Sequence, residues 1–173
     1  MKRTRGTEEF GTFETPISAA QVLERCAELE ADGLEFYQGL LKGAQSEWVR
    51  KLARMMVKAE IRHRDRFLRY AEHARASGKS EDVSAGEPLP PELARLMSER
   101  VFVSEELAER TGHNVDERKA LELAIRAEES LALLYGQIRS YVPRDQRKYL
   151  DQIIKEEQRH QSDLEKLLRK HFQ

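Results

Sequence analysis

The amino-acid sequence predicts an all-α protein, a four-helix bundle in which two antiparallel helical hairpins are joined by a long crossover. Three observations predict this fold. The composition is rich in Glu, Leu, Ala, Arg and Lys, with only 9 Gly and 5 Pro in 173 residues, which favours long helices. Four long segments carry apolar residues at three- and four-residue spacing, as helices with one buried face do. The breaks between them are short, long and short, and short loops make neighbouring helices antiparallel.

The first hairpin has clear ends. Residues 1–17 are polar and form a lead-in to the bundle. Ser18 is a good N-cap for a helix that runs to about residue 41 and is stopped by Gly43. A second helix is expected over residues 46–76, where a Ser-Gly pair ends it.

The second hairpin follows a long connection. Residues 78–113 hold three of the five prolines and are expected to contain one short helix, over residues 91–97. A connection of 36 residues is too long for an ordinary bundle loop, so it must cross the outside of the bundle or carry a function. We expect it to let the third helix begin at the same end of the bundle as the first. The third helix runs from Asn114 or Asp116 to just before Pro143, and the fourth from there to about residue 170.

Composition and charge exclude several classes of protein. With 30 basic and 31 acidic side chains the formal net charge is −1, which gives no reason to expect nucleic acid or an anionic membrane as a partner. No apolar run approaches the ~20 residues of a membrane span. The single Cys26, expected in the core, excludes a disulfide framework, a Cys-rich zinc site and a CxxC redox pair. The basic start leads into polar and acidic residues, so we expect no secretory signal, a cytoplasmic protein and one domain over residues 18–173.

The apolar stripes are interrupted only at mid-helix, and always by ionisable side chains. The first and third helices each contribute one Glu. The second and fourth each contribute a Glu and a His in ExxH spacing, which places both side chains on one face. An unpaired buried carboxylate costs on the order of several kcal/mol, so this cluster needs protons, cations or a metal. The six candidate metal ligands are Glu30, Glu60, His63, Glu128, Glu157 and His160.

The positions of these residues agree in two ways. In each hairpin the two Glu residues lie about equally far from the turn, so they reach the core at one level. The two hairpins also repeat each other at an offset of 97 or 98 residues. In this repeat Glu30 corresponds to Glu128, Tyr37 to Tyr135, Glu60 to Glu157 and His63 to His160.

Glu from two helices, together with ExxH from the other two, is the pattern of carboxylate-bridged di-iron bundles. Four carboxylates balance two divalent ions, and oxygen and nitrogen ligands suit iron or manganese. The expected cofactor is therefore two Fe ions, with Mn or Zn as substitutes. The alternative is a buried polar network in a purely structural bundle.

These motifs resemble the ferritin-like di-iron proteins, and within them the rubrerythrin-like family. The resemblance covers about residues 18–77 and 114–170. It implies a ferritin-like bundle whose metal ligands are the six residues already named. It also implies that the hydroxyls of Tyr37 and Tyr135 each reach a ligand Glu of the opposite hairpin. The matching stretches are EADGLEFY at 30–37, AEIRH at 59–63, AEESLALLY at 127–135 and EEQRH at 156–160.

The sequence departs from the family pattern at three points. It has no CxxC rubredoxin domain. Leu131 stands where rubrerythrins carry an additional Glu three residues after the ligand, so the peroxide-driven ligand exchange that this Glu serves is not implied. Ile61 stands where the related bacterioferritins carry a haem-binding Met, so no haem is expected.

The expected function is redox chemistry of iron, either oxidation of Fe(II) or two-electron reduction of O2 or peroxide. The expected partners are Fe(II) with O2 or H2O2, and an external electron donor. One alternative is a di-iron oxygenase that acts on an organic substrate in an apolar pocket roofed by residues 78–113. Another is a non-catalytic iron-binding module.

Two further groups of residues lie off the stripes. Glu129 and Glu156 adjoin ligand candidates but are expected to be solvated. A second apolar face, which supports a homodimer or meets the crossover, consists of Phe36, Leu40, Leu133 and Leu134.

Overall fold

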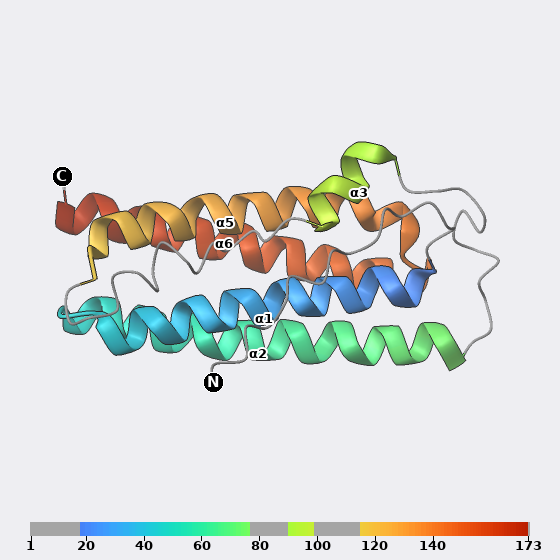
Figure 1. Ribbon diagram of the computed structural model, residues 1–173, viewed down its shortest axis with the longest axis horizontal. Coiled ribbons are helices and arrows are strands. Elements are labelled where there is room, and N and C mark those ends of the chain that lie inside the picture. Colours follow the sequence, from blue (N-terminus) through green and yellow to red (C-terminus); the bar gives the residue numbers. More distant parts are fainter. Residues whose placement is uncertain (1–17, 77–89, 99–114, 173) are drawn as a thin grey trace, which may run out of the picture.

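The computed structural model describes residues 18–76, 90–98 and 115–172, and every regular element within them is helical (Figure 1). This confirms the expected all-α bundle of two hairpins. The predicted lead-in and most of the predicted crossover lie outside the described residues. The elements are α1 (Ala19–Gly43), α2 (Glu47–Ala76), the short α3 (Pro91–Ser98), α5 (Glu117–Ile138), the 3-10 helix η1 (Arg139–Tyr141) and α6 (Arg147–Phe172). Helix α1 packs along α2, and α5 packs along α6.

Local sequence explains most of the helix ends. Ser18 caps α1 as expected: its hydroxyl accepts the Gln21 N–H, and the Gln21 side chain accepts the Ser18 N–H in return. Asp116 caps α5 through the Lys119 N–H. The fourth helix begins at Arg147, so the predicted start near Pro143 was wrong. Residues before proline favour extended backbone, and Val142 is extended, so η1 and one further turn separate the two helices.

Helix α5 begins at the end of the bundle where α1 ends. We expected it to begin at the end where α1 begins, and that expectation was wrong. Val115 lies against Gly43. A carboxylate oxygen of Glu117 accepts the backbone N–H groups of Gln45 and Ser46, in the turn between α1 and α2, at 2.6 and 2.7 Å. Because α2 ends at the opposite end of the bundle, the long connection to α5 is a geometric necessity (Figure 1).

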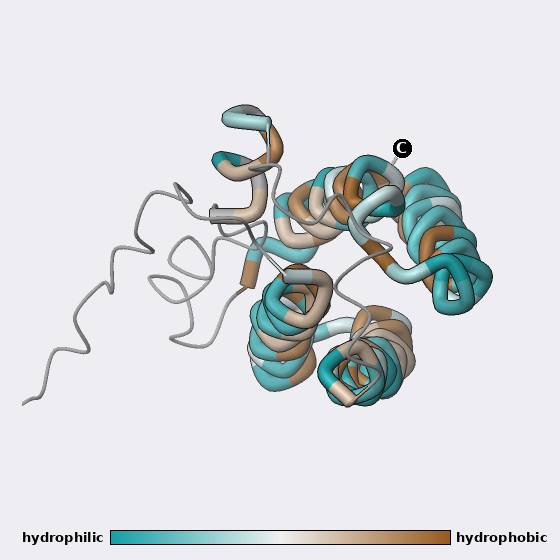
Figure 2. The backbone as a smooth tube through the Cα atoms, turned by 90° about the vertical axis from the view of Figure 1, so that its right-hand side faces the viewer, coloured by the Kyte–Doolittle hydropathy of each residue, from teal (hydrophilic) through white to brown (hydrophobic). Residues whose placement is uncertain are grey.

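The four long helices enclose a core, and α3 packs outside them (Figure 2). Leu93 and Met97 anchor α3 through their buried side chains. Nε of the buried Arg25 in α1 donates a hydrogen bond to the Met97 carbonyl. Cys26 lies in the core with no exposed surface, as expected. None of the described helices combines the length and apolarity that crossing a membrane requires.

The second apolar face is largely covered within the single chain. Phe36, Leu40 and Leu134 are almost fully buried. They belong to the hydrophobic core of the bundle. That this face meets the crossover stays a prediction. Leu133 is 63% exposed. A homodimer remains a prediction. Of the four residues of this face, only Leu133 is exposed enough to contribute to a dimer interface.

Two glycines give a matched test of the packing between the hairpins. A Cβ at Gly43 would lie 2.3 Å from Cγ2 of Val115, a branched side chain with little rotamer freedom. We therefore expect Gly43→Ala to destabilise the protein by about 1–3 kcal/mol through overpacking. Gly136 has nothing within 4 Å of the same position, and Gly136→Ala is expected to stabilise α5 by about 0.5–1 kcal/mol. Urea unfolding of both variants measures this, and equal effects would contradict the close approach.

Candidate metal centre

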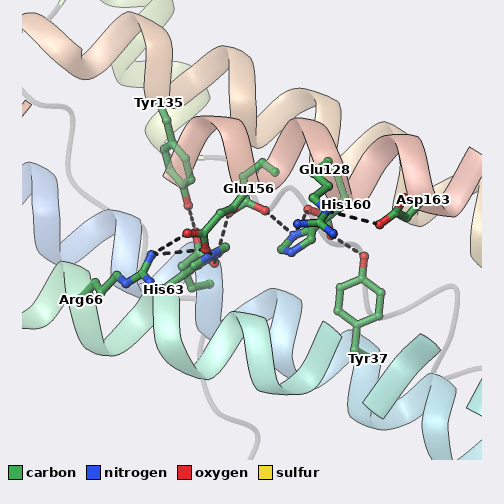
Figure 3. A network of polar contacts seen from close by, with 11 residues as sticks. Tyr37, His63, Arg66, Glu128, Tyr135, Glu156, His160 and Asp163 are labelled. Atoms are coloured by element: carbon green, nitrogen blue, oxygen red, sulfur yellow. Dashed lines mark hydrogen bonds and ion pairs between the residues drawn. The ribbon is translucent and has the colours of Figure 1, made fainter. Parts of the chain in front are cut away.

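The four long helices bring all six predicted ligands to one level in the middle of the bundle. Five of them have no exposed surface, and the side chain of His160 is 16% exposed. Glu30 comes from α1 and Glu128 from α5, while each ExxH pair projects from one face of α2 or α6. Figure 3 shows His63, Glu128 and His160 of this set. In each hairpin the two Glu residues are about equally far along the chain from the turn. They therefore reach the core at one level, as the sequence predicted.

The donor atoms form two groups, each with all its members within 4.8 Å of one another. We call the first the His63 position; it consists of Glu30, Glu60 and His63. We call the second the His160 position; it consists of Glu60, Glu128, Glu157 and His160. Glu60 belongs to both positions.

Glu157 also lies between the two positions. One of its oxygens is 2.7 Å from Nδ1 of His63, and the other is 2.9 Å from Nδ1 of His160. The remaining carboxylates lie at the outer ends, with Glu30 3.4 Å from Nδ1 of His63 and Glu128 3.6 Å from Nδ1 of His160. The geometry is that of two cation positions, each with its own Glu and His, that share the two ExxH carboxylates.

Most of the buried polar atoms that make no hydrogen bond lie in this cluster. Seven buried side-chain nitrogen and oxygen atoms among the described residues have no hydrogen-bond partner, and six of them belong to the cluster. Leaving buried polar atoms unpaired is costly, so their concentration at one point indicates a bound group that pairs with all of them. Two divalent cations fit the donor set. The six atoms are Oε2 of Glu30, both carboxylate oxygens of Glu60, Nδ1 of His63, Oε2 of Glu128 and Oε1 of Glu157.

Without metal, the same cluster holds protons. Burial raises the pKa of Glu60 well above its usual value and that of Glu128 to about 8. Burial would also raise the pKa of Glu157, but the adjacent imidazoles of His160 and His63 lower it to about 2. Burial lowers the pKa of both histidines, yet the neighbouring carboxylates raise it to about 11 for His63 and about 9 for His160. Protons therefore occupy part of the donor set at neutral pH.

Two tyrosines orient the outer carboxylates across the hairpins. The hydroxyl of Tyr37 in α1 donates to Oε1 of Glu128 in α5, and the hydroxyl of Tyr135 in α5 donates to Oε1 of Glu30 in α1 (Figure 3). Burial and the nearby carboxylates raise the pKa of both phenols well above the usual value, so the hydroxyls stay protonated. In both pairs the other oxygen, Oε2, remains free to bind a cation.

Glu156 contacts a candidate ligand, and the expectation that it is solvated was wrong. Its Oε2 lies 2.7 Å from Nε2 of His63, and Arg66 binds the same carboxylate at 3.1 Å. The side chain is 28% exposed. A carboxylate on Nε2 holds the proton there and leaves Nδ1 free to bind metal. The sequence did offer one indication of this contact. Glu156 is adjacent to the ligand candidate Glu157, so it lies at the same height in the bundle, on the side of α6 that faces α2. Glu129 is exposed, as expected.

The contact of Glu156 with His63 gives a testable prediction. We expect Glu156→Ala to weaken metal binding about 10- to 100-fold, because the imidazole loses the partner that sets its tautomer and orientation. Glu156→Gln keeps a hydrogen-bond acceptor and should lose less. Calorimetric titration with Co(II) measures the effect, with Glu129→Ala as the exposed control. Equal affinities in Glu156→Ala and the control would show that the contact does not support the metal.

A pocket of about 450 Å³ lies between α2 and α6 beside His160. Helix α3 does not line it. The part of the crossover that the structure describes packs on α1 and α5 instead. This pocket therefore gives no support to the expected organic-substrate pocket roofed by residues 78–113.

Comparison with known proteins adds one finding. The family model described as Rubrerythrin matches residues 21–168, a range that contains all six candidate ligands and both tyrosines. The curated proteins and the solved structures each give no match.

Proposed function

The chain belongs to the rubrerythrin family of di-iron carboxylate proteins, and on this premise we propose that it binds two iron ions and uses them to oxidise Fe(II) or to reduce O2 or peroxide by two electrons. The observation that carries the proposal is the set of unpaired donor atoms at the two positions. Four carboxylates neutralise two divalent cations, and a set of oxygen and imidazole donors without thiolate suits iron or manganese. Zinc would fit as a redox-inactive substitute.

The residues of this chain perform distinct tasks in that chemistry. When bound, iron supplies the electrons and polarises the O–O bond. Glu60 and Glu157 serve both positions, and Tyr37 and Tyr135 orient the outer carboxylates by donating a hydrogen bond to one oxygen of each. Five ligand side chains without exposed surface keep bulk water away, so the charges act in a medium of low dielectric.

Anaerobic loading with Fe(II), followed by exposure to O2 or H2O2 in a spectrophotometer, tests the proposal. Fast peroxide consumption with a slow O2 reaction identifies a peroxidase, and O2 consumption with retained Fe(III) identifies a ferroxidase. Glu60→Gln should abolish either reaction, because Glu60 serves both positions, while Glu129→Gln should leave it unchanged. Hydroxylation of an added substrate would show an oxygenase instead, and the absence of any reaction would leave an iron-binding module.

A further inference from the structure

A series of aromatic side chains leads from the His63 position to the surface of the bundle. We call it the aromatic row; its members are Tyr135, Phe67, Tyr70 and Tyr149. The hydroxyl of Tyr135 donates to Glu30 of the His63 position, and its ring lies against that of Phe67, with centroids 5.1 Å apart. Phe67 also follows His63 by one turn of α2, so the two side chains are neighbours on the helix. The aromatic row therefore begins beside two members of the His63 position.

The aromatic row continues along α2 and ends on α6. Tyr70 follows Phe67 by three residues, which places their Cβ atoms roughly 5–6 Å apart on the helix. The ring of Tyr70 stacks on that of Tyr149, with centroids 5.4 Å apart and planes inclined by 21°. Phe67 has no exposed surface, Tyr70 is half-buried and Tyr149 is 40% exposed, so the aromatic row crosses from the core to the surface.

The two helices are held together where Tyr70 and Tyr149 meet. The side-chain amide of the buried Gln146 donates a hydrogen bond to the Tyr70 carbonyl at 3.3 Å. A second contact joins the same segments, since Nε2 of His73 lies 3.5 Å from the Asp145 carboxylate. The stacked rings therefore belong to a defined junction between α2 and the start of α6.

The internal repeat indicates that the bundle does not need these aromatic side chains for packing. At the offset of 97 residues, a leucine corresponds to each member of the aromatic row on α2 and α6. The leucines are Leu164 for Phe67, Leu167 for Tyr70 and Leu52 for Tyr149. Leucine also fills a helix interface, but it has no π electrons and does not give up an electron as a phenol does. The row therefore offers an electron path on the side of the His63 position.

The proposed reaction has a use for such a path. Reduction of O2 to two molecules of water takes four electrons, and two Fe(II) ions supply only two of them. Without another source of electrons the reaction stops at H2O2. A tyrosine can supply one electron, because its phenol loses an electron and a proton together and becomes a neutral radical.

We propose that Tyr70 and Tyr149 supply the two missing electrons when O2 is reduced, and that these electrons reach the metal along the aromatic row. The inference rests on the proposed function. In the balanced reaction, O2, two Fe(II), two tyrosines and two protons from solvent give two waters, two Fe(III) and two tyrosyl radicals. A reductant that donates hydrogen atoms, an ascorbate or a thiol, restores Tyr149 at the surface. Transfer of an electron and a proton within the stack restores Tyr70.

The test uses protein loaded with Fe(II) under argon and mixed with O2 in the absence of reductant. Electron paramagnetic resonance of freeze-quenched samples should show a tyrosyl radical. The two adjacent radicals should then couple into a dityrosine cross-link between α2 and α6, detected by its fluorescence and by mass spectrometry of the digested protein. Tyr149→Phe should abolish the cross-link. Tyr141→Phe is the control, since Tyr141 makes no ring contact with a described aromatic residue, and it should behave as the wild type.

A second variant tests the path separately from the stack. Phe67→Leu carries the residue found at the matching position of the repeat and leaves both tyrosines in place. It should lose most of the radical and of the cross-link in the reaction of iron with O2. In metal-free protein, light with a ruthenium tris-bipyridine complex and persulfate oxidises tyrosines directly. Phe67→Leu should then form the cross-link as the wild type does, which shows that the variant is folded and its stack intact.

The outcomes separate this inference from the proposed function. If neither O2 nor peroxide oxidises the bound Fe(II), the proposed function is wrong and this inference with it. If peroxide alone oxidises the iron, or O2 does so without a tyrosyl radical and a cross-link, the aromatic row carries no electrons while the proposed function stands. Equal radical yields in Phe67→Leu and the wild type would show that the electrons do not pass along the row, and would overturn the inference.

Discussion

Replacing Glu128 by Gln will leave the metal-free protein at least as stable as the wild type and will greatly reduce its stabilisation by metal. Glu128 has no exposed surface, and its pKa of about 8 keeps it protonated at pH 7 in the metal-free protein. Gln has nearly the shape of that neutral acid, and its carbonyl oxygen can still accept the hydrogen bond from Tyr37. The second oxygen, 3.6 Å from Nδ1 of His160, becomes an amide nitrogen that cannot bind a cation.

The size of the effect follows from mass action. Metal at a thousandfold excess over its dissociation constant stabilises the fold by about 4 kcal/mol. For a domain of this length, that corresponds to a rise in melting temperature of roughly 8–16 °C. Glu128→Gln should lose most of this rise.

Melting curves with chelator and with Fe(II) under argon measure this effect. Glu129→Gln is the matched control, since Glu129 is adjacent but exposed, and it should behave as the wild type. A Glu128→Gln protein that is less stable without metal and keeps the full response to metal would assign this carboxylate a structural role.

Metal binding will release protons, and metal affinity will rise with pH. In the metal-free protein the pKa is about 8 for Glu128, about 11 for His63 and about 9 for His160, so these groups hold protons at pH 7. Burial also raises the pKa of Glu60 well above its usual value. Bound metal requires ionised carboxylates and neutral imidazoles, so up to about four protons leave as two ions bind. Glu157, with a pKa of about 2, is already ionised and contributes none.

The sign of the pH dependence follows directly. Because protons compete with the metal, binding weakens as the pH falls below 7 and tightens as it rises toward 9, through the pKa values of Glu128 and His160. Titration calorimetry in buffers of different ionisation enthalpy counts the protons released. Glu128→Gln should release about one fewer at pH 7. An affinity that does not change between pH 6 and 8 would show that the cluster is ionised before metal arrives.

The sequence predicted the six ligand candidates because two regularities apply to them together. Helical spacing assigns a residue to the core face, and the distance from a tight turn assigns its level in a hairpin. Glu30 and Glu128 satisfy both conditions. Glu156 satisfies only the second, since it lies beside the stripe, where α6 meets α2 and not the bundle axis. Stripes alone therefore miss the groups that orient ligands from the side.

Helix direction was the weaker part of the prediction. The length of a connection does not show at which end of a bundle the next helix begins. The contacts that decide it here, Val115 against Gly43 and Glu117 with the turn at Ser46, join residues about 70 apart in the sequence. Contacts between residues so far apart in the sequence cannot be predicted from a local sequence pattern. The start of α6 was also misplaced, because a proline that can begin a helix can equally end a turn.

The most direct test of the account is the position of bound metal. Crystals of the protein grown with Mn(II) or Fe(II) should give two anomalous-scattering peaks about 3.5–4 Å apart, the separation usual in two-metal sites. One peak should lie beside Glu30 and His63 and the other beside Glu128 and His160, with Glu60 and Glu157 reaching both. A single peak, no peak, or an outer Glu turned toward solvent would contradict the di-metal centre.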